Sequence, residues 1–120
     1  MSQKKLEIPE PKTEYEEILI SAYKDKMIAY MHSHPEAFPE ALDLAVTDRQ
    51  PYSWRSAWLL WSCITPNDAR VKKHLTKMIA YLPKAQDNQK RELLKICTMM
   101  QLTESQESKL IDICVQLWTD

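Results

Sequence analysis

The chain of 120 residues contains no glycine. Ordinary usage of about 7% would place about eight glycines in a chain of this length. Phosphate-binding loops, dinucleotide-binding turns and tight β-hairpin turns depend on glycine, because their backbones need its conformational freedom. The absence argues against nucleotide-fold enzymes and against most β architectures. It predicts an all-α protein whose turns use proline, Asn, Asp, Ser and Thr.

Helix starts are marked by capping boxes, in which Ser or Thr is followed three residues later by an acidic or amide side chain. The four boxes are Thr13 with Glu16, Ser33 with Glu36, Thr65 with Asp68, and Thr103 with Gln106. Pro51 and Asp87 mark two weaker starts. With apolar residues at helical spacing, these signals predict six helices, over residues 13–32, 34–47, 51–64, 66–82, 87–101 and 104–118. The apolar stripe of the first helix shifts phase near residues 24–26, which predicts a kink or a division there.

Composition indicates one soluble domain. Hydrophobic residues make up 44% and charged residues 28% of the chain, and the formal net charge is −1. No apolar run approaches the roughly 20 residues that cross a membrane, so no membrane association is predicted. Residues 1–12 hold two prolines and no apolar stretch, which predicts a flexible tail without a secretory signal, followed by a single helical domain over residues 13–120.

The three cysteines are too few and too widely spaced for a disulfide framework. They are Cys63, Cys97 and Cys114. Each stands among apolar residues at helical spacing, so all three are expected to be small core residues. Free thiols favour a reducing, cytoplasmic location.

A shift of 36 residues aligns the predicted helix 51–64 with the predicted helix 87–101. Arg55 falls on Arg91, and the apolar residues Trp58 and Ile64 fall on Leu94 and Met100. Periods in this range are typical of stacked helix pairs. Because the connections are short, consecutive helices are expected to pack as antiparallel pairs.

The segment "ALDLAVTDRQPYSWRSAWLLWSCI", residues 41–64, resembles a HEAT repeat. Such repeats have a leucine-rich helix, an Asp in the turn, a proline, and a second helix that opens with an apolar residue, Arg and small residues. Asp48, Pro51, Trp54, Arg55 and Ala57 stand at those places. The resemblance implies an α-α superhelix of about three antiparallel helix pairs, of HEAT/armadillo type. It also implies that Asp48 and Arg55 join a ladder of ion pairs and hydrogen bonds between units, although the second unit has Lys84 where Asp would stand.

Three tryptophans lie on one stripe of the predicted helix 51–64, because Trp54, Trp58 and Trp61 recur at i, i+4 and i+7. Aliphatic neighbours widen the same stripe. We therefore interpret the tryptophans as core residues that fill the seam between repeat units. The alternative is that one of them, foremost Trp58, borders a groove and stacks on a ligand.

Charge is segregated along the chain. Residues 70–95 carry eight basic and two acidic groups, whereas residues 1–48 carry five basic and ten acidic groups. One side of the predicted helix 66–82 presents Arg70, Lys73, Lys77 and Lys84, with Tyr81 nearby. A solvated helix face is the ordinary interpretation, and a partner-binding or phosphate-contacting patch is the alternative. On the inner face of a superhelix, the second helices would present Arg55, Arg91 and Lys95. Helical-repeat DNA glycosylases of the alkylation-repair type use such a basic face, a resemblance in architecture that does not carry function.

Catalytic and metal signals are sparse. His32 and His34, with Glu36 nearby, are the closest approach to a metal site, and paired cysteines or a His-Glu-x-x-His motif are missing. No cofactor and no enzymatic activity are predicted. The predicted function is a non-enzymatic scaffold or protein-interaction module with a protein partner. The alternative is a nucleic-acid-binding module that uses residues 70–95. Trp118 is a candidate contact for self-association, for example as a dimer.

Overall fold

The computed structural model describes residues 8–119, with side chains through residue 116. Within this range the chain is all helical and contains no strand, which confirms the predicted fold class. The helices are α1 (Glu14–Ser21), α2 (Lys24–Ser33), α3 (Ala37–Ala45), α4 (Tyr52–Cys63), α5 (Ala69–Lys72), α6 (Leu75–Tyr81), the 3₁₀ helix η1 (Leu82–Lys84), α7 (Asp87–Thr98) and α8 (Glu104–Thr119).

Two of the six predicted helices are divided. The first ends at Ser21 and resumes at Lys24, as the phase shift of its apolar stripe indicated. The fourth does not start at residue 66, because Asn67 has a φ of 52°, which is incompatible with a right-handed helix. Asp68 caps α5 instead, by accepting a hydrogen bond from the Arg70 N–H. A turn at Lys73 and His74 then separates α5 from α6.

Capping boxes located two of the helix starts correctly. Thr13 accepts from the Glu16 N–H, and Thr103 exchanges two hydrogen bonds with Gln106. The box at Ser33 was wrong, because Ser33 ends α2 and its hydroxyl donates to the Ala29 carbonyl. The predicted start at residue 87 agrees with α7, but the cap is Gln86, which forms a capping box with Gln89, and not Asp87.

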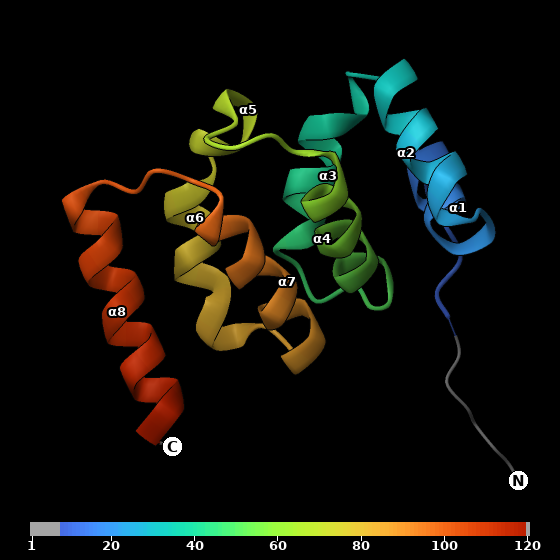
Figure 1. Ribbon diagram of the computed structural model, residues 1–120. Helices are drawn as coiled ribbons and strands as arrows, with labels where there is room; N and C mark the ends of the chain where they lie inside the picture. Colours follow the sequence, from blue (N-terminus) through green and yellow to red (C-terminus); the bar gives the residue numbers. More distant parts are fainter. Residues whose placement is uncertain (1–7, 120) are drawn as a thin grey trace, which may run out of the picture.

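The helices lie side by side in a slab. Figure 1 shows α1 and α2 at one end, α3 with α4 next to them, then α6 with α7, and α8 at the other end. The described chain extends over 44 × 41 × 19 Å, so the slab is about two helices thick. Helix α4 contacts α1, α2 and α3 on one side and α7 on the other, while α8 packs against α6.

The central position of α4 determines which of its side chains are buried. Six residues of α4 are buried, namely Tyr52, Ser53, Ser56, Ala57, Leu59 and Leu60. The three tryptophans are only half-buried. None of the three is fully buried, because α4 is covered by neighbours on two sides and its fully buried stripe is offset from the tryptophans. Trp58 and Trp61 pack against the edge of the core.

Residues 9–12 lie against the domain. The Tyr52 hydroxyl donates to the Pro9 carbonyl, Arg49 Nη2 donates to the Glu10 carbonyl at 2.7 Å, and the Lys12 N–H donates to Glu16 Oε1 at 2.8 Å. This placement differs from the predicted tail over residues 1–12, of which residues 1–7 lie outside the described range. In residues 8–119, no helix has the length and apolar character needed to cross a membrane.

Candidate functional site

The residues of the predicted basic patch are distributed over α5, the turn after it, α6 and η1. Arg70 is occupied, since Nε and Nη2 donate to the two carboxylate oxygens of Asp68 at 3.0 and 2.7 Å. Its guanidinium also lies 3.9 Å from the ring centroid of Phe38. Lys77 Nζ is 3.9 Å from Asp43 Oδ1. Two of the predicted binding cations are thus paired within the protein.

The break between α5 and α6 separates the remaining members of that patch. Arg70 and Lys73 border a depression of about 180 Å³ beside α3. Lys77, Tyr81 and Lys84 border another depression, of about 230 Å³. The turn at Lys73 and His74 interrupts the continuous helix on which the predicted patch was based.

The implied ladder through Asp48 and Arg55 takes a different form. Asp48 Oδ1 accepts from Gln86 Nε2 at 3.4 Å, and Arg55 Nη1 donates to the Leu19 carbonyl at 2.9 Å. No ion pair joins Asp48 to Arg55 among the described side chains. Both residues nevertheless bond to partners about one 36-residue period away, so they connect successive helix pairs.

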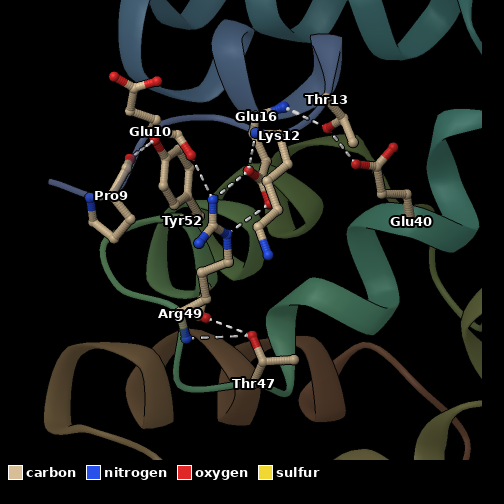
Figure 2. Close-up of polar contacts among 10 residues, drawn as sticks. Pro9, Glu10, Lys12, Thr13, Glu16, Glu40, Thr47, Arg49 and Tyr52 are labelled. Carbon is tan, nitrogen blue, oxygen red and sulfur yellow. Dashed lines mark hydrogen bonds and ion pairs between the residues drawn. The ribbon is translucent and has the colours of Figure 1, made fainter.

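Arg49 makes the ion pair that the sequence analysis did not identify. Its Nε and Nη2 donate to Glu16 at 3.0 and 2.9 Å, and its guanidinium lies 4.7 Å from the ring centroid of Tyr52. Figure 2 shows Arg49 between Tyr52 and Glu16, beside the segment from Pro9 to Lys12. The sequence signal for this ion pair was the position of Arg49, which stands beside Asp48 in the turn and about one 36-residue period after Glu16.

Two carboxylates should make the stability of the fold depend on pH. The guanidiniums of Arg49 and Arg70 hold the pKa values of Glu16 and Asp68 below their usual values. Their stabilisation is complete above the unfolded-state pKa of about 4 and is lost as pH falls through the folded-state values. Urea midpoints should therefore drop as pH falls below about 4. The double variant Glu16→Gln/Asp68→Asn should show a shallower drop, and an unchanged slope would contradict this assignment.

The exposed side of α4 carries three pairs of a cation and an aromatic ring. Lys24 Nζ lies 5.6 Å from a ring centroid of Trp58, and Lys95 Nζ lies 5.8 Å from Trp61. The third pair is Arg55 and Trp54, with the guanidinium carbon 5.8 Å from the ring. We call the surface formed by Lys24, Trp54, Arg55, Trp58, Trp61 and Lys95 the tryptophan face.

The tryptophan face spans three helices. Lys24 comes from α2 and Lys95 from α7, on the two sides of α4. Exposed Arg91 stands one turn before Lys95 on α7, and Tyr23, beside Lys24, is 91% exposed. The face therefore unites Arg55 and Lys95 with the tryptophans, and Arg91 stands beside it on α7.

Nucleophilic and metal chemistry find no support in the described side chains. Burial raises the pKa of the Cys97 thiol to about 11 and also raises that of the half-buried Cys63, so neither is activated. Cys114 is exposed, so its prediction as a core residue was wrong. His34 stacks on Tyr30, and residues 8–116 contain no group of three or more His, Cys, Asp or Glu suited to a metal. Trp118 lies outside the side chains that the structure describes.

No protein-family model, curated protein or solved structure matches the chain. The HEAT/armadillo resemblance thus stays a prediction. The candidate site is therefore defined by its residues, which are three tryptophans and the cations over their rings.

Proposed function

We propose that the chain is a non-enzymatic protein-interaction module and that the tryptophan face binds its partner. The observation that carries the proposal is the half-buried state of Trp54, Trp58 and Trp61, each with a cation over its ring. Tryptophan and arginine are enriched at binding hot spots, because they offer large contact areas and several hydrogen-bond donors. The exposed parts of these rings have an unfavourable free energy of hydration, and burial against a partner would remove that cost.

The proposal includes a HEAT/armadillo-like superhelix as the scaffold. Its support is the 36-residue period, together with side-chain contacts between helix pairs that span about one period, such as Arg55 with the Leu19 carbonyl. Helix-pair arrays present extended surfaces to partner segments. A reducing compartment such as the cytoplasm belongs to the same proposal, because the three cysteines are free.

A nucleic-acid partner for residues 70–95 has less support. These residues are divided among α5, α6 and α7, and Arg70, Lys77 and Lys95 each pair with a carboxylate of the protein. Phosphate tracking requires a row of uncommitted cations. Three of the eight cations of this segment are thus already paired within the protein.

Photo-cross-linking in the source organism tests the proposed function. p-Benzoylphenylalanine at position 23 replaces Tyr23 at the edge of the tryptophan face, where 91% exposure leaves room for the larger side chain. We expect cross-links to one defined protein, reduced at least about fivefold when Trp58→Ala is added, because removing a hot-spot ring costs more than about 1 kcal/mol of binding. The control is the same label at Ile111, which is 56% exposed on α8. Identical cross-links from both positions, or cross-links indifferent to Trp58→Ala, would contradict the proposal.

A further inference from the structure

We infer that the tryptophan face binds an acidic peptide segment, whose carboxylates pair with Lys24, Arg55 and Arg91; this inference rests on the proposed function. The ion pairs among the described side chains involve none of these three cations. Lys24 and Arg55 therefore stand beside the tryptophan rings without a carboxylate partner among the described side chains.

Arg55 is fixed in orientation, because Nη1 donates to the Leu19 carbonyl and Nε is buried. Its Nη2, which makes no hydrogen bond among the described atoms, can donate to a carboxylate of a partner. Lys95 is held 3.3 Å from Glu92 Oε1, so it covers Trp61 but adds little net charge. Lys24 and Arg55 are thus the cations that select an anion directly over the tryptophans.

The length and polarity of the tryptophan face also fit a short peptide. Trp54 and Trp61 are seven residues apart on α4, or about 10 Å along the helix axis. An extended peptide covers that length with about three residues. A short segment can therefore place a carboxylate on Lys24 and another on Arg55 while an apolar side chain between them contacts the indole rings.

The same arrangement disfavours a single-stranded nucleic acid. Base recognition without sequence preference uses open aromatic faces as stacking platforms. Here a cation covers one face of each tryptophan, and Trp58 and Trp61 also pack against the core. A base would have to displace the cation, whereas a peptide carboxylate binds to it where it stands.

Fluorescence anisotropy with defined probes tests the inference on the unmodified chain. The probe is a labelled peptide of about twelve residues composed of Glu, Asp, Leu and Phe, and the matched control has Gln and Asn in place of the acids. We expect the acidic peptide to bind at least about tenfold more tightly. We also expect its binding to weaken when ionic strength rises from about 0.01 to about 0.15 M.

Charge-reversed variants localise the binding. Lys24→Glu should weaken binding of the acidic peptide at least about tenfold. The matched control, Lys109→Glu, makes the same charge change at an exposed position of α8 and should leave binding within about twofold. Both positions are exposed, so both variants should keep the helical circular dichroism spectrum.

Three results would overturn the inference. These are equal binding of the amide peptide, tighter binding of oligothymidylate than of the acidic peptide, and equal losses from Lys24→Glu and Lys109→Glu. If the acidic peptide does not bind but position 23 still cross-links to one protein, the inference is wrong and the proposed function stands. If the acidic peptide does not bind and position 23 does not cross-link to one protein, the inference and the proposed function are both wrong.

Discussion

Replacement of Gln89 by leucine is expected to lower the free energy of unfolding by about 3 kcal/mol. Gln89 is fully buried in α7, and its Nε2 donates to the carbonyls of Ala45 and Thr47 at 2.8 and 2.9 Å. Its Oε1 accepts from Gln50 Nε2 at 3.0 Å. Leucine has a similar volume, but it leaves two backbone carbonyls without their donor. Each unpaired buried group costs about 1–3 kcal/mol.

Urea unfolding followed by circular dichroism measures this effect. Gln101→Leu is the control, because Gln101 is exposed and only its backbone makes a hydrogen bond. The control should change the free energy of unfolding by less than about 0.5 kcal/mol. If Gln89→Leu lowers the free energy of unfolding by as little as the control does, the buried hydrogen bonds of Gln89 do not hold the loop after α3.

Gln89 also links the fold to the candidate site. The loop that it holds leads directly into α4, and α4 packs against α7. The distance between these helices sets the position of Lys95 over Trp61. A damaged Gln89 bridge should therefore weaken partner binding as well as stability.

Local signals in the sequence were sufficient for the fold class. The absence of glycine follows from the composition alone. The caps at Thr13 and Thr103 and the phase shift near residue 24 depend only on neighbours within a few positions. The break after Asn67 was not predictable in this way. The segment from Thr65 to Asp68 also fits a helix start, and Asn67 is held in its turn by a hydrogen bond from its N–H to the distant Met99 carbonyl, at 2.7 Å.

The candidate site was predictable in its residues but not in its surroundings. Helical spacing correctly placed Trp54, Trp58 and Trp61 on one stripe. It did not show whether that stripe faces the core, because the covering elements, α2 and α7, are distant in sequence. For the same reason, the contact between Lys24 and Trp58 had no local signal.

The offset between the tryptophans and the core predicts that Leu60→Ala lowers the free energy of unfolding more than Trp61→Ala does. Leu60 is fully buried, so Leu60→Ala should lower the free energy of unfolding by about 3 kcal/mol, including the cost of the cavity. Trp61 has a much larger side chain but is half-buried at the edge of the core. Trp61→Ala should therefore cost only about 1–2 kcal/mol, from the apolar area it loses.

The ranking separates the two interpretations of the stripe. If the tryptophans filled the seam between helix pairs, Trp61→Ala would cost about 3–5 kcal/mol, as fully buried aromatic residues do, and would exceed Leu60→Ala. Urea unfolding of both variants decides between these outcomes. Acrylamide quenching of tryptophan fluorescence supplies an independent check, because partly exposed indoles are quenched more strongly than fully buried ones. A smaller cost for Trp61→Ala, together with strong quenching, would leave binding rather than packing as the reason for three tryptophans on α4.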